Sequence, residues 1–249
     1  MADVLHRIAA DEIKDRLSEI NRSFTDIAVV TGYSALWSEL FPNARRLPDD
    51  EVLDLAPGSL DLVIHAMALH WADDPVGQIV QCARSLRSDG LFIAVCPAGR
   101  SLWELREVLA QAETDIAGGL SPRVLPMADL RDLGALIGRG GLALPVADLL
   151  PLPASYRDLT HLAHDLRAMG ETNALAGRLR RLTGRAVFAQ AEAIYAARHP
   201  DPNAPARVRA TFELAFLTGW SPSDTQQKPL RPGSAKMPLA EALNQIGDP

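Results

Sequence analysis

Three short apolar runs alternate with helix-like segments in the first half of the chain, and this alternation restricts the possible folds most strongly. The runs lie at 26–30, at 61–67 ("DLVIHAM") and at 91–97 ("LFIAVCP"). After each run, apolar residues recur at helical spacing, over 33–41, 75–86 and 101–118. Strands that alternate with helices of this kind form βαβ units around a parallel sheet. We therefore predict a doubly wound α/β fold.

The remaining segments complete a single domain in this prediction. Residues 1–22 form an N-terminal helix, 23–150 the sheet core, 151–206 a helical insertion, and 207–249 the last strand and a tail. Two local signals predict helix ends. Gly90 follows "RSD" and is predicted to cap the helix before it. Ser101 and Glu104 have the spacing of a capping box.

Composition excludes several function classes. A net charge of -6 and a pI near 5.5 argue against nucleic-acid binding, which requires a basic patch. No apolar run reaches the length of a membrane span, and the N-terminus lacks the apolar core of a signal peptide. Cys82 and Cys96 lie in apolar surroundings, so we expect two reduced core cysteines. The chain is expected to be cytoplasmic, and its oligomeric state stays open.

Four long stretches resemble the class I S-adenosylmethionine-dependent methyltransferase superfamily. Within it they are most similar to the branch of complex I assembly factor 5 and the biotin-synthesis-type methyltransferases. The stretches are "APGSLDLVIHAMALHWADDP", "GGLSPRVLPMADLRDLGALIGRGGLALPV", "DLRAMGETNAL" and "FLTGWSPSDTQQKPLRPGSAK". The resemblance implies a Rossmann-like fold and S-adenosylmethionine as cofactor. It also implies a protein substrate or partner such as a respiratory complex I subunit, and arginine hydroxylation is associated with that factor.

The glycine-rich turn of the family is altered in this chain. The family pattern resembles D-x-G-x-G-x-G, whereas Thr31, Gly32 and Tyr33 stand at the matching cofactor position. An L-residue forced to positive φ costs on the order of 1 kcal/mol, and its side chain fills ligand space. Tyr33 would occupy such space. The acid that opens the family motif is also absent, which indicates a degenerate cofactor site with weak or absent cofactor binding.

The cofactor half is also shorter than the resemblance implies. A second strand survives at most as "ARRLP", and the helix that normally follows it is missing. Asp49 and Asp50 match the family's acidic segment on the adenine side, so they are candidate cofactor residues. The alternative is a solvated acid pair that caps a helix. The predicted fold is therefore a Rossmann-like methyltransferase fold with a shortened N-terminal cofactor half.

Two further groups are candidate site residues. His70 and Trp71 follow a core strand, where ligands collect in open parallel sheets. His70 is either a base near a substrate or a loop histidine beside an aromatic lid, and the sequence shows no partner carboxylate for it. Gln226, Gln227, Lys228 and Arg231 form a candidate substrate or partner loop, or alternatively a wrap around the strand end.

No motif assigns a catalytic residue or a metal. His65 is expected to be a satisfied core histidine, and His161 with His164 a surface pair rather than a metal site. Ser121 and Ser234 lack nucleophile motifs. The segment 169–173 ("MGETN") is either a helix end or a loop on the substrate side. Three functions stay open: a methyltransferase, a non-catalytic assembly module, and an arginine-modifying enzyme that acts on a complex I subunit.

Overall fold

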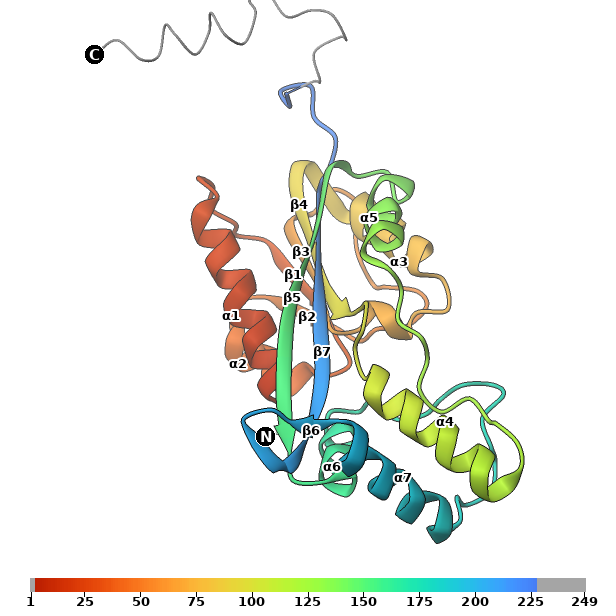
Figure 1. Cartoon of the computed structure of the whole chain (residues 1–249). Coiled ribbons are helices and arrows are strands. Elements are labelled where there is room, and N and C mark those ends of the chain that lie inside the picture. Colours follow the sequence, from red (N-terminus) through yellow and green to blue (C-terminus); the bar gives the residue numbers. More distant parts are fainter. Residues whose placement is uncertain (1–2, 228–249) are drawn as a thin grey trace, which may run out of the picture.

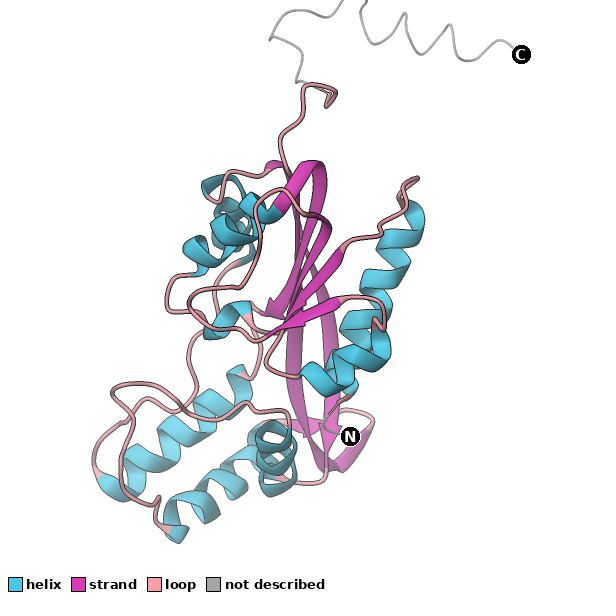
Figure 2. Ribbon diagram, turned by 180° about the vertical axis from the view of Figure 1, so that it is seen from behind, coloured by secondary structure: helices cyan, strands magenta, loops and turns pink. Residues whose placement is uncertain are grey.

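The computed structural model describes residues 3–227, in which seven strands form one mixed sheet (Figures 1 and 2). The helices of this part of the chain are α1 (Val4–Glu19), α2 (Ser34–Leu40), α3 (Pro75–Ser85), α4 (Trp103–Ala117), α5 (Leu130–Arg139), α6 (Leu159–Ala168) and α7 (Arg185–Arg198), with a 3-10 turn, η1 (Leu69–Trp71). The strands are β1 (Ile27–Val30), β2 (Arg45–Leu47), β3 (Leu60–Ala66), β4 (Leu86–Pro97), β5 (Ala143–Tyr156), β6 (Pro200–Asp201) and β7 (Ala204–Trp220).

The strand order is β2-β1-β3-β4-β7-β5, and β6 pairs with β7. The first four strands are parallel, whereas β7 runs antiparallel between β4 and β5. Register aligns Val30 with Leu47 on one side and with His65 on the other. The doubly wound α/β fold predicted from the alternating pattern is confirmed.

Helices cover both faces of the sheet because its central strands are apolar on both sides. Val29 packs in a cluster with α1 and α2, whereas its neighbour Val30 packs in the opposite cluster with α3 and α5. A third cluster joins α4, α6 and α7 to the far ends of β5 and β7. Figure 1 shows these three helices grouped beyond one end of the sheet; α6 and α7 belong to the segment 151–206 predicted as a helical insertion, whereas α4 comes from the preceding segment.

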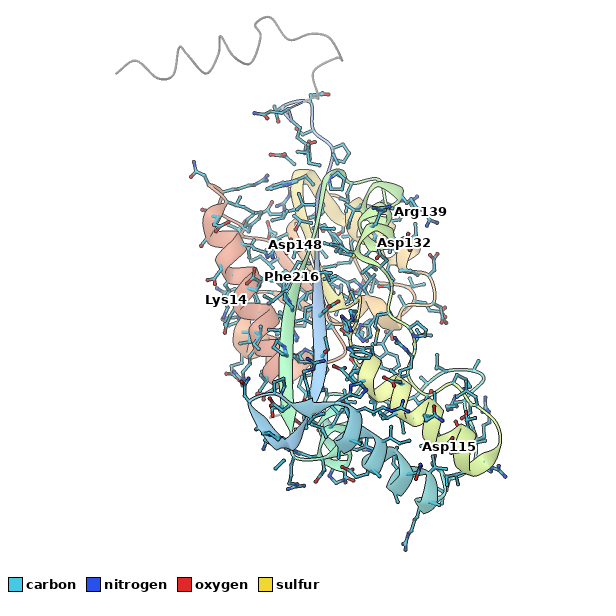
Figure 3. All side chains as sticks on the ribbon, in the orientation of Figure 1. Lys14, Asp115, Asp132, Arg139, Asp148 and Phe216 are labelled. Atoms are coloured by element: carbon cyan, nitrogen blue, oxygen red, sulfur yellow. The ribbon has the colours of Figure 1, made fainter. Side chains whose placement is uncertain are left out.

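Besides its apolar packing, the N-terminal helix is joined to the sheet by an arginine. Arg16 donates from Nη1 to Asp148 of β5 at 2.7 Å, and its guanidinium lies over the Phe216 ring at 4.4 Å. Figure 3 shows Asp148 and Phe216 on the two long neighbouring strands. Among the described helices, none is both long enough and apolar enough to cross a membrane.

Two predicted helix signals are wrong. The helix α3 ends at Ser85, and Gly90 lies inside β4, where its carbonyl accepts from the Ser221 N–H at 2.8 Å. Ser101 does not cap α4, because its hydroxyl bonds to the backbone of Glu213 in β7. In both cases, the polar groups expected to cap a helix instead form hydrogen bonds with β7 or the residue that follows it.

The shortened cofactor half is visible in the structure. The predicted second strand exists as the three-residue edge strand β2. Between β2 and β3, residues 48–59 contain neither helix nor strand. Within the described part of the chain, β2 is therefore the outermost strand on this side of the sheet, and no helix follows it before β3.

Candidate functional site

The carboxyl ends of β1, β3 and β4 meet at one edge of the sheet, which we call the carboxyl edge. The chain leaves β1 toward β2 on one side, while β3 pairs with β1 on the other side. The order of strands therefore reverses next to β1. In open α/β sheets, ligands bind in the crevice at such a reversal. Candidate site residues are therefore expected at residues 31–33 and 67–71.

The loop after β1 is tightly hydrogen-bonded. Thr31 is buried, its N–H donates to Leu47 O at 3.0 Å, and its hydroxyl accepts from the Tyr33 N–H at 3.1 Å. Gly32 is exposed between them. A Cβ placed on Gly32 would lie 3.3 Å from the Asp49 carboxylate. The predicted residues Gly32 and Asp49 are thus side by side at the carboxyl edge.

Tyr33 points back toward the N-terminal helix. Its ring stacks on His6 of α1, with ring centroids 4.9 Å apart and an angle of 21° between the planes. His6 Nδ1 in turn accepts from the Trp37 indole N–H at 3.1 Å. Indole only donates, so Nδ1 carries the lone pair and His6 is neutral. Burial lowers the pKa of His6, which favours the same state.

Asp49 and Asp50 differ in their surroundings. Asp49 is half-buried beside Gly32, whereas the Asp50 side chain is exposed. The Asp50 carbonyl accepts from the Gln78 amide at 2.7 Å. Neither residue flanks a helix within the described structure, so the predicted alternative of a helix-capping pair is not what the backbone forms.

His65 presents an unused acceptor next to these acids. Gln78 donates to Asp50 through its amide nitrogen, so its oxygen accepts from His65 Nε2 at 3.0 Å. This arrangement leaves His65 Nδ1 as a buried acceptor for which residues 3–227 offer no donor. Desolvation lowers the pKa of His65, against the opposing influence of Gln78 and Asp49. The core placement predicted for His65 is confirmed, but only one of its ring nitrogens is satisfied.

His70 has a carboxylate partner that the sequence does not reveal. Its Nε2 lies 2.9 Å from Glu171 Oε1, and both side chains are largely shielded from solvent. Trp71 is partly exposed and packs against the His70 ring with centroids 5.7 Å apart. Glu171 belongs to the "MGETN" segment after α6. The structure therefore joins two stretches that the sequence analysis treats separately.

A small cavity of about 30 Å³ lies beside this pair. Its walls are mainly apolar, and three polar residues contribute to them: His6, Ser101 and Glu171. The apolar residues are Leu5, Met67, Pro97, Leu102, Met127, Leu166, Met169 and Phe212. That volume corresponds to about one water molecule. None of the predicted cofactor residues lines it.

Two strained residues belong to the same cavity. Met67 and Leu102 have φ values of 52° and 55°, in the left-handed region that bulky residues rarely adopt. Met67 immediately follows β3, and Leu102 precedes α4. Such strain persists only where the surrounding structure fixes the backbone, and it often clusters at functional sites, although Asp89 and Leu144 also have positive φ elsewhere in the fold. The carboxyl edge next to Glu171 is thus the best candidate site.

The described part of the predicted tail loop lies elsewhere. Gln226 donates to the Asp89 carboxylate at 3.0 Å and to Ser221 O at 2.9 Å, next to the amino-terminal half of β4. Gln227 is exposed. Both residues are at the opposite edge of the sheet from His70. Lys228 and Arg231, like Ser234, lie outside the described residues, and a role for this loop in binding stays a prediction.

Other candidate residues have structural partners. Ser121 donates to Glu113 at 2.8 Å. Within residues 3–227, no three His, Cys, Asp or Glu side chains form a group that could hold a metal ion, and the surface role of His161 and His164 stays a prediction. Glu171 and His6 are the site residues that sequence reasoning missed. The only signal for either was the unusual "MGETN" stretch, which marks Glu171 but not its partner.

Comparison with known proteins places the chain in a family. A model described as "Methyltransferase domain" matches residues 5–94. Arginine-hydroxylase NDUFAF5 of Homo sapiens is 30% identical over 265 residues, which cover 96% of this chain and 76% of the relative. The Danio rerio protein of the same name is 34% identical over 81% of this chain. The malonyl-[acyl-carrier protein] O-methyltransferase of Laribacter hongkongensis is 33% identical over 78% of it.

The chain spans 61% of the length of the Danio rerio relative and 63% of the Laribacter hongkongensis protein. Among solved structures, the YcgJ protein of Bacillus subtilis matches with a TM-score of 0.53 and 14% identity, over 86% of this chain and 99% of that one. At that identity the likeness shows the fold alone. Together, these similarities show that the chain belongs to the class I S-adenosylmethionine-dependent methyltransferase superfamily, in the branch of NDUFAF5 and the biotin-synthesis-type methyltransferases.

Proposed function

We propose that this family member binds S-adenosylmethionine weakly or not at all and acts by binding a protein partner. The observation that carries the proposal is the Tyr33 ring stacked on His6 at 4.9 Å. This ring stands where the family turn has glycine, and it is fixed by a residue of another helix. The cavity beside Glu171 has a volume of about 30 Å³, enough for about one water molecule, so it does not offer the cofactor an alternative pocket.

The carboxyl edge fits the family cofactor only in part. Gly32, the Asp49 carboxylate and His65 Nδ1 would suit a ligand that carries hydroxyl or amino groups. Two features do not suit this cofactor: the Tyr33 side chain in the turn, and the lack of a helix or strand over residues 48–59. We therefore derive no chemical step through the cofactor.

A partner in respiratory complex I assembly is the role that the family resemblance supports. A protein partner also agrees with the net charge of -6, which does not favour nucleic acid. In this proposal the fold is retained as a scaffold for protein contacts, and the protein acts in the cytoplasm. The location can be checked by fractionation of cells that express the tagged full-length chain.

The assembly role is tested in cells that lack this protein. Wild-type protein and Asp49→Leu, which removes the carboxylate beside Gly32, are expressed at equal levels. We expect both to restore the same amount of assembled complex I, measured on native gels and as NADH oxidation. If wild-type protein does not restore complex I, the proposed role in complex I assembly is refuted. Restoration by wild type but not by a folded Asp49→Leu would refute the cofactor-independent mechanism.

A second candidate function is modification of an arginine side chain on a protein partner. It is favoured by one observation, the Glu171 carboxylate on the wall of an apolar cavity, held by His70 at 2.9 Å. A carboxylate pairs well with a guanidinium group, which would have to approach Glu171 from outside, because the cavity itself holds only about one water molecule. Under this alternative, Glu171→Gln would abolish restoration of complex I while Asp50→Asn, an exposed neighbour of the same site, would not.

A further inference from the structure

One end of the molecule carries basic and apolar side chains together. We call it the basic tip and define it as residues 116–120 and 178–188. Its core is the end of α4 and the start of α7, which pack side by side beyond the sheet (Figure 1). In Figure 3, Asp115 marks this end, whereas Arg139 lies at the opposite end. The tip is therefore a projecting surface, remote from the candidate site.

The charge of the tip is opposite to that of the chain. Residues 178–188 contain four arginines and no acid, although the whole chain has a net charge of -6. Arg180, Arg181 and Arg185 are exposed, and none of them has an ionic partner within the described part of the chain. Asp115, just before the tip, is exposed and keeps its negative charge, since its partner, the Gln111 amide at 2.7 Å, is neutral. The four arginines of residues 178–188 still give the tip a net positive charge.

Apolar side chains are exposed among these arginines. Leu182 is 97% exposed and Leu120 is 69% exposed, while Ile116 and Phe188 are 49% and 44% exposed. Phe188 follows Arg185 by three residues, so both lie on one face of α7. Large apolar side chains so fully exposed in a small region indicate a binding surface.

The segments that carry these side chains are tied together. Arg123 donates to the Thr183 hydroxyl at 2.9 Å, and the Asn173 amide donates to Pro122 O at 2.9 Å. Arg123 also pairs with the buried Glu113 of α4 at 2.8 Å. The exposed leucines are therefore displayed on a fixed surface, and their exposure is a property of the folded protein.

We propose that the basic tip binds the surface of an anionic lipid bilayer. Arginines interleaved with leucine and phenylalanine match the boundary between phosphate headgroups and acyl chains, where cations meet phosphates and apolar side chains insert. Each basic residue near an anionic membrane adds attraction that salt screens. Projection of the tip beyond the sheet allows contact with a flat surface. The tip would hold the chain at a membrane although no helix of residues 3–227 can span one.

The test is sedimentation of the full-length protein with lipid vesicles. Vesicles of phosphatidylcholine alone are compared with vesicles that also contain phosphatidylglycerol. We expect binding only to the anionic vesicles, and its loss in high salt. The double variant Arg180→Glu/Arg181→Glu should lower the partition coefficient about tenfold or more. Leu182→Ser should lower it by about fivefold, because that side chain no longer inserts.

The matched control is Arg131→Glu/Arg139→Glu, which makes the same change of net charge on exposed arginines of α5 at the other end of the molecule (Figure 3). It should bind as the wild type does. Equal loss in the control would show attraction by net charge alone and would overturn the proposal. Equal binding to neutral vesicles would also overturn it. No binding to either vesicle would overturn it in favour of an acidic protein surface as the partner of the tip.

Discussion

The His70 imidazole lies 2.9 Å from the Glu171 carboxylate, although 101 residues separate the two in sequence. His70 is on the turn after β3, and Glu171 follows α6 of the helical insertion. The pair therefore connects the carboxyl edge of the sheet to the helices beyond it. Because Glu171 also lines the apolar cavity, the same contact shapes the candidate site.

Coupling between His70 and Glu171 can be measured by a double-mutant cycle. His70→Ala and Glu171→Ala should together destabilise the protein less than the sum of the single variants, by about 0.5–1.5 kcal/mol. The free energy of unfolding from urea titrations at neutral pH gives the four values. Strictly additive effects would mean that the two side chains do not interact in solution.

Removal of the Tyr33 ring should open the cofactor turn. Tyr33→Gly takes away the side chain that stacks on His6, and we expect its affinity for S-adenosylhomocysteine to exceed that of the wild type by about tenfold or more. Tyr33→Phe keeps the ring and is the matched control, with wild-type behaviour. Equal affinities of all three proteins in calorimetric titrations would show that the ring does not obstruct the ligand.

Stability in acid should depend on Glu113. The Arg123 guanidinium, with hydrogen bonds from Ser121, lowers the pKa of Glu113 from 4.5 to about 2. A carboxylate with a depressed folded-state pKa stabilises the protein above its unfolded pKa, and this contribution is lost as pH falls from about 4.5 to about 2.

Glu113→Gln should therefore lower the free energy of unfolding by about 2 kcal/mol near pH 7. The difference from wild type should shrink as the pH is lowered through that interval. Denaturant titrations at several pH values provide the measurement, with Glu19→Gln, an exposed acid, as the control. A difference that is constant with pH would contradict the assigned ion pair.

The two cysteines should be unreactive in the native protein. Cys82 and Cys96 are buried and free, which confirms the sequence prediction, and burial raises the pKa of each thiol to about 12. Alkylation requires the thiolate, so iodoacetamide should label neither residue in buffer and both in guanidinium chloride. Mass spectrometry counts the labels. Rapid labelling of the native protein would contradict the buried placement.

Elements with a strong repeating pattern could be predicted from sequence alone. The strands around Val29 and Ile64 are apolar on both faces, as buried parallel strands must be, and the structure places each of them between two neighbouring strands. The long final strand and both helices of the insertion were found in the same way. Their signals are local, because side-chain periodicity is a property of one segment.

Contacts across the fold could not be predicted in that way. The partner of His70 comes from a segment beyond α6, and the partner of Tyr33 comes from α1, so neither is visible within a local window. The caps expected at Gly90 and Ser101 failed for a related reason. The Gly90 carbonyl and the Ser101 hydroxyl accept hydrogen bonds from Ser221 and from Glu213 of β7, respectively. These tertiary bonds override the local tendency of both residues to cap a helix.

The proposed function requires that the turn around Gly32 and Tyr33 does not bind S-adenosylmethionine tightly. The most direct measurement is calorimetric titration of the full-length protein with S-adenosylmethionine and S-adenosylhomocysteine. We predict no heat of binding up to about millimolar ligand, equivalent to less than about 4 kcal/mol of binding free energy. Binding of either compound at about micromolar concentration would contradict the claim and identify the chain as a cofactor-binding methyltransferase.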